Sequence, residues 1–305
     1  MKKFLLHIAF WGAQIALVYA LVISLHAGPK TDYFYNRFTQ PKAKSMIIGS
    51  SRAAQGIIPS VIKNKVGLAV FNYSFTNHNS PYGEYYLEAI KRKISGEKGG
   101  IFVLEVSPFV LSNYIQNMES DKEVFDECNT APSNMLMVTM NPNFEYMLRN
   151  YSDDIQTLTG VKERPYDIWL HDDGWLEINI PFDTTYFREN TEEKVKNYSE
   201  LIQKIRPSDQ RQKAFKRSVS YLKEYGTVVL VKIPVSQEMR TIENQYYPKF
   251  SHAIEDIAEE LEVDFLDYGH LDSELHFTDG NHLHRSSAKV FTEILGDDLS
   301  EVLKD

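Results

Sequence analysis

Short apolar runs that end at turn residues alternate along this chain with longer amphipathic stretches, and this alternation constrains the fold more than any other feature. The runs with the length and composition of buried strands lie at 45–49, 69–73, 100–106, 227–234 and 263–267. Strands that alternate with helices are joined by crossover connections, so they lie parallel in one sheet with helices on both faces. We therefore predict an α/β fold: a three-layer α/β/α sandwich around a parallel sheet.

Several of the intervening stretches carry helix signals. The predicted helices lie at 80–94, 208–226, 248–262 and 286–303. Ser80 is expected to cap the first of them, with Pro81 at its first position, where a missing N–H costs nothing. Ser208 is expected to cap the second, which should end at Gly226.

The regular alternation stops between Pro108 and Pro207. This stretch contains scattered prolines and a methionine-rich patch, and it lacks the clean periodicity of either a helix or a strand. Two interpretations remain open. In the first, this stretch is an insertion, about 108–207, in a domain that spans 45–305. The insertion covers the carboxyl edge of the sheet, where α/β folds bind ligands. Alternatively, it forms a small, partly independent domain.

Composition excludes some classes of function. The chain has 305 residues, a formal net charge of -9 and one cysteine, Cys128. Binding to phosphates needs clustered Lys and Arg side chains, so the acidic balance argues against a nucleic-acid partner. A single cysteine excludes an internal disulfide and any zinc site built from several cysteines. Cys128 is therefore expected to be a small packing residue.

An uncharged, mostly apolar run covers residues 4–25 and follows Lys2 and Lys3. As a helix this run would be about 33 Å long, enough to cross a bilayer. Because positive charges favour the cytoplasmic side, residues from about 30 onward would then lie outside, in the periplasm or at the cell surface. We predict a transmembrane anchor. The alternative is a cleaved signal peptide, which would give a secreted protein.

Two short motifs at opposite ends of the chain carry candidate chemistry. Ser50 and Ser51 follow Gly49 at the end of the first predicted strand, where a serine can present its hydroxyl above the edge of the sheet. Asp279 precedes His282 by three residues, just before the last predicted helix. A serine nucleophile needs an imidazole to take its proton and a carboxylate to orient that imidazole. If both loops rise from the same sheet edge, these residues form a triad.

These motifs resemble the first and last blocks of the SGNH (GDSL-type) hydrolase superfamily. The family's first block reads Gly-Asp-Ser, and Ser50 stands here in place of its Asp. The Gly-Ser-Ser form resembles envelope branches of the superfamily, such as the DltD-like and O-acyltransferase-like proteins. The resemblance covers most of 45–303 outside the insertion. It implies that Ser51 is the nucleophile, His282 the general base and Asp279 its orienting carboxylate.

The middle blocks of the family match poorly. The second block supplies a glycine N–H to the oxyanion hole; Asn77 falls nearest to that glycine and can offer its backbone N–H beside that of Ser51. The side chains of Asn77 and Asn79 are further candidate donors. The third block, Gly-x-Asn-Asp, is replaced by Glu-Val-Ser-Pro at 105–108. Its asparagine donor is therefore missing or supplied from elsewhere, which matters because one such donor contributes about 3 kcal/mol.

The resemblance implies an extracytoplasmic, serine-dependent acyl-ester hydrolase or O-acyltransferase that acts on a cell-envelope glycan or a similar acylated substrate. No cofactor and no metal are implied. The expected partners are an acylated glycan or small ester, the membrane through residues 4–25, and other proteins of envelope biosynthesis. The altered middle blocks suggest an alternative from a different class: a non-catalytic protein that assembles or binds envelope polysaccharide and retains the SGNH fold.

Three features near these motifs have more than one interpretation. Arg52, beside the expected nucleophile, either binds an anionic substrate group or forms a buried structural ion pair. The histidines within 276–284 could bind a metal ion together with Asp279, although their spacing matches no standard motif; His284 is otherwise expected to cap or pack against the last helix. Residues 243–248 either line a substrate cleft or form a plain loop that leads into a helix.

Overall fold

The structure is a computed structural model that describes residues 1–26, 32–117, 120–125, 127, 130–151 and 166–304. Cys128, the expected packing residue, lies outside the described residues.

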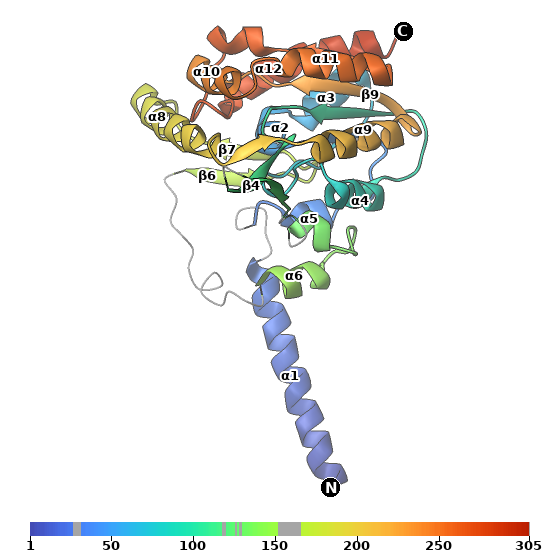
Figure 1. Ribbon diagram of the computed structural model, residues 1–305. Coiled ribbons are helices and arrows are strands. Elements are labelled where there is room, and N and C mark those ends of the chain that lie inside the picture. The colour runs from blue at the N-terminus through green and yellow to red at the C-terminus, as the bar shows by residue number, and fades with distance from the viewer. Residues whose placement is uncertain (27–31, 118–119, 126, 128–129, 152–165, 305) are drawn as a thin grey trace.

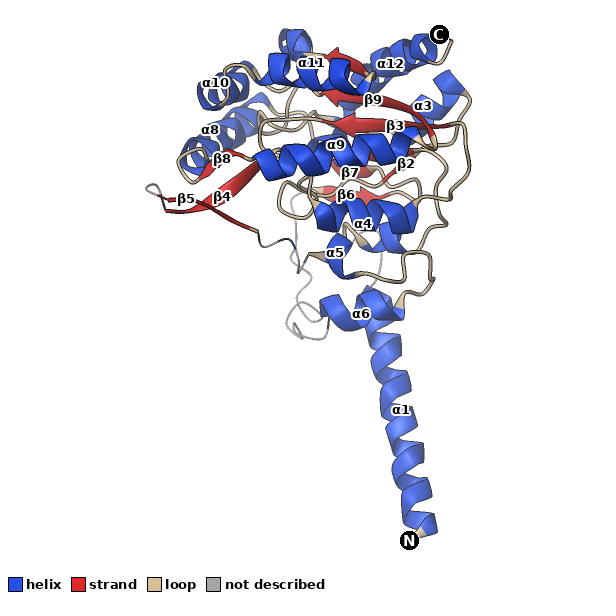
Figure 2. Cartoon of the chain, turned by 45° about the vertical axis from the view of Figure 1, so that its right-hand side comes forward, coloured by secondary structure: helices blue, strands red, loops and turns tan. Residues whose placement is uncertain are grey.

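A five-stranded parallel sheet forms the centre of the described part of the chain (Figure 2). Its strands are β1 (Met46–Ile48), β2 (Phe71–Asn72), β3 (Gly100–Glu105), β9 (Gly226–Lys232) and β10 (Asp264–Asp267). They pair in the order β10-β9-β3-β1-β2, and each of these pairs is parallel. Each predicted run overlaps one of these strands, and the predicted α/β class with a parallel central sheet is confirmed.

Helices cover both faces of this sheet (Figure 1). One face packs against α4 (Glu84–Lys93), α9 (Asp209–Lys223) and α11 (Phe250–Leu261), and the other against α2 (Ser51–Gly56), α3 (Pro59–Val66) and α12 (Arg285–Val302). Successive strand side chains point to opposite faces, so Phe102 and Leu104 enter the first layer while Ile101 and Val103 enter the second. This two-sided burial explains why the strands read as continuous apolar runs.

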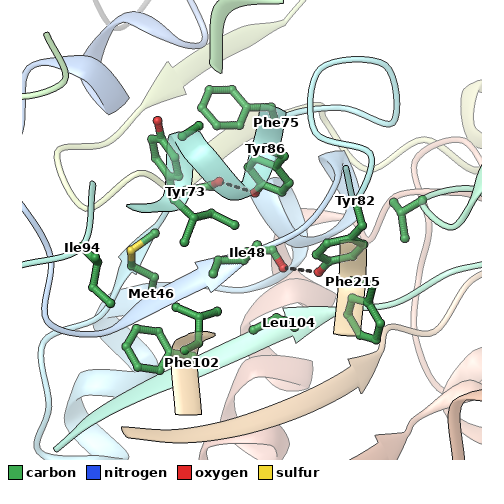
Figure 3. Close-up of a cluster of buried hydrophobic side chains, with 14 of the residues drawn as sticks. Met46, Ile48, Tyr73, Phe75, Tyr82, Tyr86, Ile94, Phe102, Leu104 and Phe215 are labelled. Atoms are coloured by element: carbon green, nitrogen blue, oxygen red, sulfur yellow. Dashed lines mark hydrogen bonds between the residues drawn. The ribbon is translucent and has the colours of Figure 1, made fainter. Parts of the chain in front are cut away.

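The layer between the sheet and α4 is rich in aromatic rings (Figure 3). Tyr82 packs edge-on against Phe215, with ring centroids 4.6 Å apart, and donates its hydroxyl hydrogen to the carbonyl oxygen of Glu105 at 2.8 Å. Tyr86 donates in the same way to the carbonyl oxygen of Tyr73 at 2.6 Å. Burying such a side chain contributes roughly 1.5–3 kcal/mol, and the hydroxyl bonds avoid the cost of unpaired buried polar groups. These hydroxyl bonds therefore connect the core to the carboxyl end of β3 and to the segment after β2.

The helix expected over 80–94 begins later than predicted. α4 starts at Glu84. Ser80 does not cap it; its hydroxyl donates to the carbonyl oxygen of Gly49 at 2.7 Å. The prediction is wrong because Ser80 is recruited by a tertiary contact, which ties the loop after β2 to the turn after β1.

The other predicted helices occur with slightly shorter bounds, as α9, α11 and α12. Ser208 caps α9 as expected, since its hydroxyl accepts the N–H of Arg211 at 3.2 Å. The loop expected around 243–248 is wrong in its first part, because helix α10 (Gln237–Tyr246) extends through it. Ser236 caps α10 by accepting the N–H of Met239 at 3.3 Å.

The stretch between β3 and α9 contains regular elements that its sequence pattern does not predict. They are β4 (Ser112–Asn117), β5 (Ser120–Val124), α5 (Ala131–Asn134), α6 (Phe144–Tyr151), β6 (Asp167–Leu170), β7 (Leu176–Asn179), α8 (Thr184–Leu201) and β8 (Ile205–Pro207). β4 pairs antiparallel with β5 and β8, and β6 with β7. Phe109 and Ile202 pack with Met239 of α10 in one cluster. Through this cluster the stretch lies against elements that follow β9 at the carboxyl edge of the sheet.

Helix α1 (Lys2–His26) projects away from the α/β body (Figures 1 and 2). Large apolar side chains on it are exposed, among them Phe4, Leu6 and Leu17. Among the residues that the structure describes, no helix combines the length and the apolar character needed to cross a membrane. The 3-10 helices η1 (Tyr35–Phe38) and η3 (Gly269–Ser273) lie before β1 and after β10.

Candidate active site

The first motif lies where the order of the sheet reverses. The chain leaves β1 for β2 on one side and returns to β3 on the other, and α/β sheets bind ligands at the carboxyl ends of the strands at such a point. Gly49 follows β1, and a Cβ atom there would lie 2.6 Å from Cβ of Glu105. Only glycine therefore lets β1 and β3 approach this closely. Ser50 is the N-cap of α2, its hydroxyl accepting the N–H of Arg52 at 3.3 Å, and Ser51 is the first helical residue.

Glu105 binds the backbone of the turn that carries Ser51. The N–H of Ser50 donates to Oε2 of this fully buried carboxylate at 2.8 Å. Burial raises the pKa of Glu105 above its ordinary value, although Arg52 and the hydrogen bond from Ser50 act against that rise. Glu105 thus supports the turn that carries Ser51, and its side chain offers no amide donor.

The second motif meets the first. Nε2 of His282 lies 2.8 Å from Oγ of Ser51, and its Nδ1 lies 2.9 and 3.0 Å from the two carboxylate oxygens of Asp279. Oδ1 of Asp279 also accepts the backbone N–H of His282 at 2.9 Å. The spacing of three residues therefore closes a compact turn in which one carboxylate binds both the ring and the backbone of the histidine. Gly280 makes the turn possible with a φ of 73°, in the left-handed region.

A lysine from the central stretch pairs with the same carboxylate. Nζ of Lys194, on α8, lies 3.1 Å from Oδ2 of Asp279. Burial raises the pKa of Asp279, but attraction to His282 and Lys194 outweighs burial and holds it well below its ordinary range. Burial lowers the pKa of Lys194, but attraction to Asp279 raises it by more, so the pKa of Lys194 lies above its ordinary value. The carboxylate is therefore charged throughout the neutral pH range.

Arg52 forms a buried ion pair and does not face an open anion site. Its Nη1 lies 2.5 Å from Oε1 of Glu243 on α10, with both side chains nearly fully buried. Its Nε and Nη2 donate to Oδ1 of Asn281 at 3.0 and 2.7 Å. Nδ2 of Asn281 lies 3.2 Å from Nε2 of His282. Of the two interpretations of Arg52, the structural ion pair is the one that the structure supports.

The candidate oxyanion donors differ in their surroundings. Ser51 occupies the first turn of α2, whose N–H groups have no partner within the helix. The side chain of Asn77 donates to the hydroxyl of Tyr198 on α8 at 3.2 Å. The side chain of Asn79 donates to Oγ1 of Thr76 at 2.8 Å, within its own turn. The side-chain amides of Asn77 and Asn79 are thus both engaged by other contacts, and the backbone N–H of Ser51 remains a candidate donor.

A cavity of about 280 Å³ borders Asp279 and His282. Its wall contains Asp279, His282 and Thr278 from the last loop, Gln55 from α2, Ile178 from β7, Ile180, Tyr166, and Tyr186, Asn190, Glu193, Lys194 and Asn197 of α8. The lining mixes amides, hydroxyls and charges with two isoleucine side chains. Part of a polar organic molecule can therefore bind next to His282.

The other two histidines of 276–284, His276 and His284, contact neighbouring side chains and backbone. His284 is the N-cap of α12, and its Nε2 lies 3.1 Å from the carbonyl oxygen of Ile180. Burial lowers the pKa of His284, which favours its neutral form. His276 packs its ring against Phe182. Within the described ranges, no group of three or more His, Cys, Asp or Glu side chains is placed to hold a metal ion.

Sequence reasoning brings together Ser51, Asp279 and His282, and it misses the residues that surround them. Asn281 stands inside the second motif, so its position was a usable signal. Lys194 carried none, because it reaches the site through the packing of α8 over a large separation in sequence. Glu243 lies in the stretch that was considered for a substrate cleft, and it pairs instead with the buried Arg52.

The comparisons with known proteins add little to this geometry. No family model matches the chain, and no curated protein does. The chain is similar to the structure of a proposed platelet activating factor from Streptococcus pneumonia, with 12% identity, a TM-score of 0.39, and coverage of 96% of this chain and 99% of that one. It is also similar to Est24, a carbohydrate acetylesterase from Sinorhizobium meliloti, with 8% identity, a TM-score of 0.38, and coverage of 85% and 99%. Both TM-scores lie below 0.5, so neither likeness carries an argument about this chain.

Proposed function

We propose that this chain is a serine-dependent acyl-ester enzyme, either an esterase or an O-acyltransferase of the SGNH type. One observation carries the proposal: Oγ of Ser51 lies 2.8 Å from Nε2 of His282, whose Nδ1 is held by both oxygens of Asp279. A nucleophile, a base in hydrogen-bond reach and a carboxylate that orients the base are the parts that acyl transfer requires.

In the first half of the proposed reaction, Oγ of Ser51 attacks the ester carbonyl carbon while its proton passes to Nε2 of His282. Asp279 keeps the other ring nitrogen protonated and stabilises the imidazolium that forms. In this proposal the N–H of Ser51, the first residue of α2, donates to the oxygen that becomes negative. When the tetrahedral intermediate collapses, Nε2 returns the proton to the leaving alcohol, and the acyl group stays on Ser51.

In the second half, water or a second alcohol attacks the acyl-serine. His282 takes the proton of the attacking hydroxyl and returns it to Oγ of Ser51 as the acyl group leaves. The product is a free acid in a hydrolase and a new ester in a transferase. The leaving alcohol and the incoming acceptor both approach from the side of His282, where the cavity lies.

The lining of this cavity supports a hydroxyl-rich alcohol part, as in an acylated glycan. Gln55, Asn190 and Asn197 offer amide donors and acceptors, while Tyr186 offers a ring and a hydroxyl. Side chains of this kind pair with sugar hydroxyls better than with an alkyl chain, because unpaired buried polar groups are costly. A small soluble ester remains the simpler substrate of the same class.

We also propose that the protein works outside the cytoplasm at a membrane. The uncharged run at 4–25 and the exposed apolar side chains of α1 support this location. Its test is fractionation of cells that produce the full chain, followed by a carbonate wash and by protease treatment of intact cells. Membrane recovery and cleavage from outside are expected. A chain that stays in the cytosolic fraction would contradict the location and leave the chemistry unaffected.

The chemistry is tested by steady-state hydrolysis of 4-nitrophenyl acetate by the purified full chain. Ser51→Ala and His282→Ala are each expected to lower kcat at least about 10³-fold, since the triad acts as a unit. Ser220→Ala and His252→Ala are matched controls on outer helices, and they should retain wild-type rates. Turnover that survives in Ser51→Ala would contradict the proposal. A folded wild type without any turnover would favour the non-catalytic polysaccharide-binding alternative.

A further inference from the structure

A series of hydrogen bonds connects the buried Arg52 through Asn281 to His282, the proposed base. Arg52 is nearly fully buried, and its three donor nitrogens are all engaged, Nη1 by Glu243 and Nε and Nη2 by one oxygen of Asn281. A guanidinium only donates hydrogen bonds. The atom that receives two of its donors must therefore be the amide oxygen of Asn281, which settles an orientation that is otherwise an assignment.

The orientation of the amide also fixes what the NH₂ group of Asn281 does. With its oxygen held by Arg52, Asn281 turns its NH₂ group toward Nε2 of His282, at 3.2 Å. An NH₂ group also only donates. It therefore favours the form of His282 in which Nε2 carries a lone pair and Nδ1 carries the proton, toward Asp279. This is the form that can accept the proton of Ser51 at 2.8 Å.

We propose that Arg52 is a positioning residue that locks the Asn281 amide with its NH₂ group on Nε2 of His282, and so keeps this nitrogen ready as the proton acceptor for Ser51. The inference rests on the proposed function and extends it beyond the triad. It gives a role to a buried charged pair, Arg52 with Glu243, that is connected through Asn281 to a histidine of the cavity wall.

The hydrogen bonds from Arg52 to the Asn281 amide, which we call the lock, also act after proton transfer. Once Nε2 is protonated, it faces an NH₂ group that cannot accept its hydrogen, and Arg52 prevents the amide from turning its oxygen inward. The imidazolium is thereby a stronger acid and passes its proton to the leaving alcohol more readily. The charged groups around His282 are Asp279 at Nδ1, Lys194 of α8 behind Asp279, Glu193 of α8 in the wall of the same cavity, and Arg52 of α2 neutralised by Glu243 of α10.

The decisive variant is Asn281→Asp, which keeps the shape and the oxygen that Arg52 holds but presents a second oxygen to Nε2. The measurement is the pH dependence of kcat/KM for 4-nitrophenyl acetate. The midpoint of its acid limb is expected to move to higher pH by about one unit or more in Asn281→Asp, and by about half a unit in Asn281→Ala, where one hydrogen bond is lost. Arg52→Lys should move the midpoint in the same direction, because a lysine cannot hold the amide with two donors.

The double variant Arg52→Lys/Asn281→Ala separates positioning from a direct effect. If Arg52 acts through Asn281, this variant shows no shift beyond that of Asn281→Ala alone. Asn244→Asp, exposed on α10, and Arg217→Lys, in a surface pair with Glu84, are matched controls that should keep the wild-type midpoint. A rate that falls equally at every pH, with an unmoved midpoint, would show that Asn281 only supports the loop and would overturn the proposal.

A second readout does not require turnover. The ¹⁵N chemical shifts of the His282 ring report which nitrogen carries the proton, and they are expected to show protonation at Nδ1 in the wild type and a mixture of forms in Asn281→Ala. A wild type with no Ser51-dependent hydrolysis but this ring state would refute the proposed function alone. A wild-type ring protonated at Nε2, or a ring state unchanged in both Asn281 variants, would refute the lock.

Discussion

Asp279 shows how much one carboxylate can do at the scale of a residue. It binds the ring and the backbone N–H of His282 and is paired with Lys194. Burial alone would raise its pKa, yet the two cationic partners hold that pKa well below its ordinary range. A group whose pKa is lowered in the folded state contributes stability above its unfolded pKa, near 4, and this stability is lost as the pH falls below that value.

We therefore predict that Asp279→Asn lowers kcat for ester hydrolysis by about 10³- to 10⁴-fold, because an amide favours the wrong tautomer of His282. The variant should also lose less stability than the wild type when the pH is lowered from 6 to 3, since it has no charge to neutralise. Rate assays and urea unfolding at both pH values measure the two effects. Wild-type kcat in Asp279→Asn would contradict the role of this carboxylate.

The contact of Ser51, His282 and Asp279 could be predicted because each of the two motifs is local. Gly49 to Ser51 and Asp279 to His282 are short runs whose polar side chains cost free energy to bury unless they have hydrogen-bond partners. The oxyanion donors could not be predicted in the same way. Whether an asparagine such as Asn79 faces the site or bonds within its own turn depends on the loop conformation, and the sequence contains no signal for that choice.

At the scale of elements, α8 is the segment of the central stretch that contributes most to the site. It provides Lys194 to Asp279 and several side chains to the cavity wall. The sequence of 108–207 predicted an insertion at this edge without its elements. The signal was weak because α8 buries one residue, Phe187, and therefore lacks a continuous apolar stripe.

Removing the charge from α8 tests its part in the site. In Lys194→Ala, the acid limb of the pH profile of kcat/KM is expected to shift to higher pH by about half a unit, because one positive charge near the imidazolium is lost. Activity at the optimum should fall less than in the triad variants. Lys196→Ala, exposed on the same helix, is the control. A shift to lower pH in Lys194→Ala, or the same shift in Lys196→Ala, would contradict this assignment.

The errors in helix bounds share one cause. Ser80 and residues 243–246 were predicted from local propensity, whereas Ser80 bonds to the turn after β1 and Glu243 lies on α10 and pairs with Arg52. Local signals predicted Ser208 correctly because its hydroxyl accepts the N–H of Arg211 while it donates to Oε2 of Glu123 at 2.7 Å, so this tertiary contact does not displace the cap. Tertiary contacts decide such bounds wherever a polar residue lies near the buried edge of the sheet.

At the scale of the whole molecule, one buried charge sets a dependence of stability on pH. Lys93 at the end of α4 is fully buried, and its Nζ donates to the carbonyl oxygens of Gln40 and Val138, each at 2.7 Å. Burial lowers the pKa of Lys93 to about 7. Between this value and the unfolded pKa, near 10.4, the unfolded chain binds more protons, so stability rises with pH in that range.

We predict that Lys93→Met removes this rise, which amounts to at most about 1.4 kcal/mol per pH unit for one group. Urea unfolding at pH 7 and pH 9 gives the difference in the free energy of unfolding for each protein. This difference should be smaller in Lys93→Met than in the wild type, while Lys91→Met, half-exposed on the same helix, should retain it. Equal pH dependence in wild type and Lys93→Met would contradict the assignment.

The fold as a whole could be predicted because strand and helix signals alternate along most of the chain, and such alternation permits few topologies. The sheet order brings the end of β1 beside the loop before α12, so residues 231 positions apart in sequence meet as Ser51 and His282. The position of α8 over this edge could not be predicted, because it depends on packing against α10.

The central claim is that Ser51 is a working nucleophile, and the most direct test is covalent. The purified full chain is treated with a fluorophosphonate and examined by intact mass and by peptide mapping. We predict one equivalent of label on Ser51, slow or absent labelling in His282→Ala, and none in Ser51→Ala. A folded wild type that stays unlabelled, or a label found on another serine, would contradict the account.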